Sequence, residues 1–163
     1  MPKLLKDGVF PAPDPWIIVD GQEGHPEDPG NKILPLELYL RIDSDRRQQG
    51  DIGIRLENHC DLDELALPWA QIPIVALEFP AFTDGRAFSQ ARVLRDNLDF
   101  KGDIRATGEI LVDQIYYLRR CGFNEILLAD EEKEETVKAC LRAFNENYQA
   151  ASDDPQPLFR RRA

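Results

Sequence analysis

The chain has 163 residues, and its 30 acidic against 20 basic side chains give a formal charge of −10. This length suits one domain whose hydrophobic core needs neither disulfides nor metal, and we expect a single domain over residues 1–163. The negative charge argues against nucleic-acid binding, because such binding requires clustered positive charge. It favours a basic partner surface, although the same acidity would also simply keep a cytosolic protein in solution.

Cysteine and histidine usage argues against a metal site or a redox centre. The three cysteines, Cys60, Cys121 and Cys140, form no C-x-x-C pair and suit a reducing compartment. They are too few to hold an iron–sulfur cluster, and His25 and His59 are too isolated to form a metal site. No dinucleotide or Walker motif occurs either. We therefore expect no cofactor and no metal.

The chain also lacks long apolar segments. Its first eight residues contain no uninterrupted apolar run of signal-peptide length, and no later run approaches about 20 apolar residues. We therefore expect a cytoplasmic protein with no membrane contact.

The N-terminal part predicts short strands followed by a loop. Residues 4–19 are expected to form a short β-hairpin and a further strand, which three prolines confine to the edge of a sheet. Residues 20–32 are rich in Asp, Gly, Pro and Glu and predict a loop. Residues 1–32 would thus precede the main body of the domain.

From Pro35 onward, predicted helices and strands alternate. The expected strands are 52–56, 72–79, 104–106 and 125–129. The expected helices run from Pro35 toward Arg46, from the N-cap Asp61 through Ala66, through Ala87, Ala91, Leu94 and Leu98, from Leu111 to Cys121, and through Val137, Cys140, Leu141, Phe144 and Tyr148. Four successive strand–helix units predict an α/β fold with a parallel sheet and right-handed crossovers.

The length limits how far such a sheet can close. An eight-unit barrel needs about 250 residues, so we expect an open sheet or a partial barrel. A partial barrel leaves edges that the N-terminal strands or a partner, including a second copy in a homodimer, would cover. Residues 151–163, with Pro155, Pro157 and three consecutive arginines, predict a mobile tail.

Charged and glycine residues gather where two predicted strands end. Because the carboxyl ends of parallel strands share one edge of a sheet, side chains at these positions are expected to meet in one cleft. The candidate cleft residues are Asp84, Gly85, Thr107, Gly108, Asp113 and Gln114. Arg86 and Arg105 are candidates for binding a small anion in that cleft. The catalytic residues, if the protein is an enzyme, stay unknown.

Arg105 lies within a short apolar strand, where a charge is costly unless it is paired. The candidate partners are Asp84 and Asp113. A structural salt-bridge network and an anion-binding site both satisfy this requirement, and the sequence leaves them open. Asp84 and Gly85 also fit a plain helix N-cap.

Three motifs in order carry a resemblance to a known family. The run from Phe79 to Arg92, FPAFTDGRAFSQAR, is followed by GDIRATG from Gly102 to Gly108, by Asp113-Gln114, and by Arg120 to Phe123. Together they resemble a bacterial family catalogued as domain of unknown function nine-three-four. The match is clearest over residues 70–125. Ala87 stands where the second glycine of the family would be expected.

The resemblance implies a role in sulfur assimilation and cysteine biosynthesis. Such families are often encoded beside assimilatory sulfite reductase, and members carry the label of an oxidoreductase of sulfite reduction. The resemblance therefore implies an accessory protein that docks to the reductase or its electron donor. Two alternatives stay open: a small anion-binding enzyme or oxidoreductase of sulfur metabolism that uses an Arg/Asp cleft, and a purely structural subunit.

Overall fold

Eight strands form one sheet at the centre of the molecule. The computed structural model describes residues 1–20, 29–144 and 146–161. The strands are β1 (Lys3–Lys6), β2 (Val9–Ala12), β3 (Trp16–Ile18), β4 (Asn31–Pro35), β5 (Ile52–Leu56), β6 (Ile74–Phe79), β7 (Asp103–Gly108) and β8 (Glu125–Leu128). Their order across the sheet is β2-β1-β8-β7-β6-β5-β4-β3. Strands β3 to β8 are parallel to one another, whereas β1 is antiparallel to both β8 and β2.

Short helices connect most of the strands. The α-helices are α1 (Leu36–Arg41), α2 (Ser44–Arg47), α3 (Arg86–Arg92), α4 (Ile115–Cys121), α5 (Glu134–Leu141) and α6 (Leu158–Arg161). A π-helical turn, Val93–Asn97, prolongs α3, and two 3₁₀ turns cover Trp69–Gln71 and Val112–Gln114. Gly122, at φ +108°, ends α4 in the left-handed conformation, as the sequence predicted.

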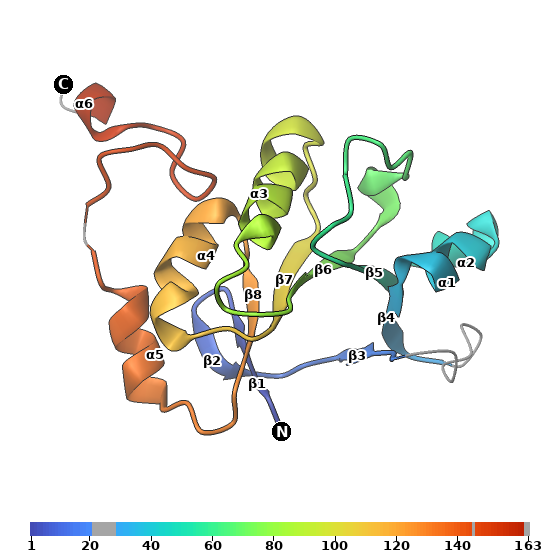
Figure 1. Ribbon diagram of the computed structural model, residues 1–163, viewed down its shortest axis with the longest axis horizontal. Helices are drawn as coiled ribbons and strands as arrows, with labels where there is room; N and C mark the ends of the chain where they lie inside the picture. Colours follow the sequence, from blue (N-terminus) through green and yellow to red (C-terminus); the bar gives the residue numbers. More distant parts are fainter. Residues whose placement is uncertain (21–28, 145, 162–163) are drawn as a thin grey trace.

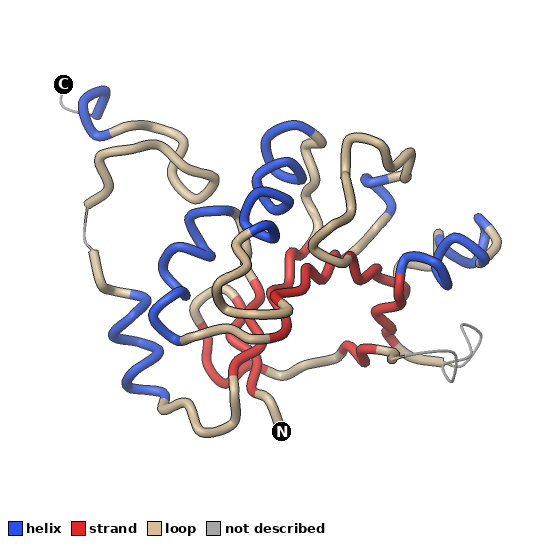
Figure 2. The backbone as a smooth tube through the Cα atoms, in the orientation of Figure 1, coloured by secondary structure: helices blue, strands red, loops and turns tan. Residues whose placement is uncertain are grey.

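The sheet curls into a half-barrel, with α1, α3, α4 and α5 on its outer face (Figures 1 and 2). The main hydrophobic core lies between this face and the helices, and the predicted core residues Ala87, Ala91 and Leu94 are fully buried there. The partial-barrel alternative is thus the one that the chain adopts.

The inner face of the sheet is closed from the other side. The chain between β2 and β3, residues 13–15, crosses the open side of the half-barrel (Figure 2), and we call it the strap. A small apolar cluster of Ile33, Ile74 and Ala76 lies on the inner face, with Trp16 and Ile18 packed against it. The strap and β3 therefore cover part of the inner face.

The α/β class and the mostly parallel sheet are confirmed, but the sheet is not built from four βα units. Six strands are mutually parallel, and β5 reaches β6 with only a 3₁₀ turn between them. The N-terminal strands do not stand apart as a separate hairpin, because β1 pairs directly with β8 and thereby joins the main sheet.

One strand was not predicted from the sequence. β4, Asn31–Pro35, begins inside the segment predicted as a loop, of which residues 21–28 lie outside the described residues. Its apolar content is limited to Ile33 and Leu34 before a proline, which is too short a pattern to distinguish from a helix start. The helix that follows also breaks, because Ile42 is extended and separates α1 from α2.

Two predicted helical segments are absent from the described chain. Residues 61–68 form turns, and the Asp61 carboxylate accepts from the backbone N–H of Asp63 instead of capping a helix. At the other end, α5 stops at Leu141, so Phe144 and Tyr148 are exposed and are not part of a buried stripe. In both cases the apolar spacing was too short to enforce a helix against local turn formation.

The end of β7 requires glycine for two reasons. Gly108 has φ +97°, and a Cβ built there would lie 2.3 Å from the carbonyl oxygen of Phe79 on β6. Gly50 has a similar φ of +79° with nothing within 4 Å. Comparing substitutions at these two glycines therefore separates the cost of a left-handed backbone from the cost of a Cβ collision.

We predict that Gly108→Ala lowers the free energy of unfolding by more than the roughly 1–2 kcal/mol that a left-handed alanine alone costs. Gly50→Ala, the matched control, carries the conformational cost only. Urea denaturation of both variants measures the difference, and equal losses would contradict the close approach of β6 and β7.

Candidate functional site

Asp84 and Arg86 form an ion pair with each other across Gly85 at the start of α3. Arg86 Nε and Nη2 donate to the two carboxylate oxygens of Asp84 at 3.0 and 2.6 Å, and Asn58 Nδ2 donates to Asp84 Oδ2 at 2.7 Å. The hydrogen bond from Arg86 is the main reason that the pKa of Asp84 falls to about 2. Arg86 is exposed, so this pair sits at the protein surface.

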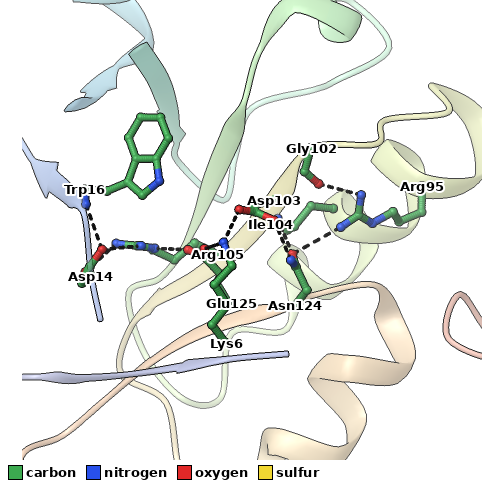
Figure 3. A network of polar contacts seen from close by, with 10 residues as sticks. All are labelled: Lys6, Asp14, Trp16, Arg95, Gly102, Asp103, Ile104, Arg105, Asn124 and Glu125. Atoms are coloured by element: carbon green, nitrogen blue, oxygen red, sulfur yellow. Dashed lines mark hydrogen bonds and ion pairs between the residues drawn. The ribbon is translucent and has the colours of Figure 1, made fainter. Parts of the chain in front are cut away.

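Arg105 is fully buried, as its setting in an apolar strand predicted. Its partners differ from those predicted: Nε donates to Glu125 Oε2 at 2.7 Å, and Nη1 and Nη2 donate to Asp14 at 3.0 and 2.7 Å (Figure 3). Among the described residues, neither Asp84 nor Asp113 pairs with Arg105. The reason is geometric, because Arg105 projects from the middle of β7 onto the inner face, whereas Asp84 and Asp113 lie beyond the carboxyl ends of β6 and β7.

The ion pairs continue along β1 and β8. Lys6 Nζ donates to Asp103 Oδ2 at 2.6 Å and to Glu125 Oε1 at 2.7 Å, so Glu125 lies between Lys6 and Arg105. Asn124 Nδ2 donates to Asp103 Oδ1 at 2.7 Å, and its own Oδ1 accepts from the backbone of Ile104. This inner-face network therefore ties β1, β7, β8 and the strap together (Figure 3).

The network shifts the protonation equilibria of its members. Burial works to lower the pKa of Lys6, but its hydrogen bonds to Asp103 and Glu125 outweigh burial and hold that pKa above its ordinary value. Burial works to raise the pKa of Asp103, and the hydrogen bonds from Lys6 and Asn124 outweigh it in the opposite direction. Both groups are thus held in their charged forms.

The remaining predicted cleft residues serve mainly local contacts. Thr107 Oγ1 donates to the Leu77 carbonyl at 3.2 Å. Gln114 Nε2 donates to the Phe82 carbonyl at 3.3 Å, while its Oε1 accepts from the Leu111 N–H. Asp113 is exposed and has no partner among the residues that the structure describes. Gln114 and the loop before α3 therefore share one end of the sheet, but Arg105 does not join them.

Two hollows flank the loop after β5, at the carboxyl edge of the sheet. One, of about 400 Å³, lies between this loop and α1 and includes Arg41, Arg55 and His59. The other, of about 310 Å³, includes Arg86 and Gln90. Arg55 is paired with Asp20, and His59 lies 3.2 Å from a Glu57 carboxylate oxygen. Arg55 and His59 were not among the cleft residues predicted from the sequence, although their place in and just after strand β5 was a usable signal.

A third hollow, of about 560 Å³, is predominantly apolar, and we call it the apolar groove. It lies beyond the carboxyl ends of β7 and β8. Its walls include Pro2, Phe82, Ile110, Leu111, Leu127 and Leu128. Phe82 and Leu111 are 52% and 47% exposed, and together with the other walls they form a contiguous apolar surface.

The described residues form neither a metal-ligand cluster nor a membrane-spanning helix. Within residues 1–20, 29–144 and 146–161, no three His, Cys, Asp or Glu side chains group as they would to hold a metal ion. His25 lies outside these ranges. No helix in the same ranges has the length and apolar character needed to cross a membrane. Burial raises the pKa of the Cys121 thiol, which lies in the core at the end of α4.

The fold and its inner-face network define an α/β half-barrel protein whose central arginine is neutralised from within. The chain belongs to the family described as "Bacterial protein of unknown function (DUF934)", whose model matches residues 53–159. No curated protein and no solved structure matches the chain.

We predict that Arg105→Met lowers the free energy of unfolding by about 3–5 kcal/mol, because it leaves the buried Glu125 carboxylate with one cation instead of two. Arg86→Met, the control at an exposed pair, is expected to destabilise the protein much less than Arg105→Met. Arg105→Lys keeps the charge without the planar fork and should fall between them. Chemical denaturation measures all three, and an Arg105→Met loss as small as that of Arg86→Met would contradict a stabilising network.

A second prediction concerns acid unfolding. The folded-state pKa of Asp103 lies below its ordinary value of 3.8, so its stabilising contribution is complete above that value and is lost as the pH falls through the folded pKa. The difference in unfolding free energy between the wild type and Asp103→Asn should therefore shrink as the pH falls from neutral through the acid range in which carboxylates become protonated. Urea titrations across this range test it, and a constant difference would show that Asp103 does not act through its charge.

Proposed function

We propose that the protein is a docking accessory of assimilatory sulfite reduction that binds sulfite reductase or its electron donor. The observation that carries this proposal is the distribution of charge. The chain has 30 acidic against 20 basic side chains, and among the described residues Lys6, Arg105 and Arg120 together engage only Asp14, Asp103, Glu125 and Asp153, so most of the acidic excess remains for the surface. An acidic surface steers a basic partner toward it.

The alternative is a small anion-binding enzyme or oxidoreductase of sulfur metabolism. It would need arginine donors that a solute can reach. Arg105 donates from all three nitrogens to carboxylates at zero exposure, so an anion would have to displace Asp14 from it. Arg41 and Arg55 beside the hollow near α1 give this alternative its remaining support, although Arg55 is engaged by Asp20.

The docking proposal predicts direct binding. The purified protein, titrated into sulfite reductase and separately into its electron donor, should bind one of them, and added salt should weaken the complex because the attraction is between opposite charges. Sulfite or sulfate alone should leave the melting temperature unchanged. A melting temperature that rises with sulfite concentration, without binding to either protein, would favour the anion-binding enzyme instead.

The physiological prediction follows from the same proposal. Deleting the gene should slow growth on sulfate or sulfite, and added cysteine should restore it. Complementation with Arg86→Met should restore growth if the protein acts by docking alone, whereas the anion-binding alternative, in which Arg86 would hold the anion, predicts that it fails. Equal growth of the deletion strain on all three sulfur sources, in a strain without a second copy of the gene, would refute the link.

A further inference from the structure

The apolar groove combines two exposed large apolar side chains with a partly carboxylate rim. Phe82 and Leu111 are about half exposed on its walls, which otherwise consist largely of aliphatic side chains from the ends of β7 and β8. Water in contact with these walls would be released if a partner covered them. Covering this surface with a partner would therefore lower the free energy of the system.

Carboxylates lie in the groove and next to it. Glu109 lines the groove itself, and two residues after its Ala129 wall the chain enters a hollow whose lining includes Glu131, Glu132 and Glu135 together with Lys3 and Lys133. In that hollow Lys138 pairs with Glu134. No partner is present for Glu109, Glu131, Glu132 or Glu135 among the described residues, and we call these four the acidic rim. Lys3 lies within 3.4 Å of Asp130, and Lys133 offsets one of the four carboxylates, so the rim keeps a net negative charge.

We propose that the apolar groove is the docking surface, and that its occupant is a partner segment whose apolar side chains are flanked by lysine or arginine. The inference rests on the docking function proposed above and names the surface and the partner chemistry. Apolar burial in the groove supplies affinity, and the rim selects basic flanks over acidic ones. A second copy of this chain presents the same acidic rim, so like charges oppose it as the occupant.

Three synthetic peptides of one length test the chemistry: one of leucine and lysine, one of leucine and glutamate, and one of serine and lysine. Binding is measured by fluorescence anisotropy. The wild-type protein should bind the leucine–lysine peptide most tightly. Because both elements are required, the other two peptides should bind at least roughly tenfold more weakly. Equal binding of the serine–lysine peptide would show that binding depends on charge alone and not on the apolar groove. It would overturn the inference.

Matched variants test the location. Phe82→Ser with Leu111→Ser should weaken the leucine–lysine peptide by roughly tenfold or more, since a few apolar anchors carry most interface energy. Val9→Ser with Ile17→Ser removes side chains that are 60% and 63% exposed elsewhere and should leave binding unchanged. Likewise Glu131→Gln with Glu132→Gln should weaken binding, whereas Glu37→Gln with Glu64→Gln should not. Circular dichroism melting confirms that each variant is folded.

The outcomes separate this inference from the proposed function. If the peptide binds through the groove but neither sulfite reductase nor its electron donor binds, the groove stands and the sulfite role fails. If one of those proteins binds the Phe82→Ser, Leu111→Ser variant as tightly as the wild type, the groove is wrong and the docking function stands. A wild-type dimer that dissociates with the same substitutions, seen by sedimentation, would identify a second copy as the occupant and overturn the inference.

Discussion

The buried guanidinium of Arg105 constrains the structure more than any other single group. At zero exposure, such a charge is tolerated only when carboxylates meet its donors, and they come here from two elements, Glu125 on β8 and Asp14 on the strap. The carboxylate of Asp14 also accepts from the backbone N–H of Trp16 at the start of β3. One side chain in the middle of the sheet therefore fixes how the chain crosses from β2 to β3.

The pairing of Arg105 also determines which parts of the molecule have polar groups that a ligand could reach. The polar inner face, which resembles a binding site in composition, is occupied by its own charges: Glu125 is shared between Arg105 and Lys6, and Asp103 takes Lys6 and Asn124. Its polar groups satisfy one another, so they stabilise the fold instead of awaiting a solute. The accessible features are displaced to the carboxyl edge of the sheet and to the surface beyond β7 and β8.

The sequence carried the information for β6, β7 and the buried face of α3, because continuous apolar runs and regular spacing determine those elements. It also showed that Arg105 needed a carboxylate. Glu125 was within reach of reasoning, since it begins the strand that follows β7 and neighbouring strands tend to pair. Asp14 was not, because it sits between two prolines in a segment without periodicity, and its pairing depends on the curl of the whole sheet. The strand β4 was not predicted for a related reason, since its position depends on pairing with β3 on one side and β5 on the other.

The same reasoning explains why the family motifs did not disclose a reaction. Within the run from Phe79 to Arg95, Gln90 donates to the carbonyls of Glu57 and Cys60. Arg95 donates to the carbonyls of Phe100, Gly102 and Gly122. These side chains hold backbone loops, and a loop carbonyl without a donor would be costly to bury. In this motif, maintaining the loop geometry of the half-barrel is the role that these two side chains perform, because their hydrogen bonds hold the connecting loops in place. The partner recognition proposed above would then depend on surfaces such as the apolar groove, whose side chains follow no spacing that a sequence pattern reveals.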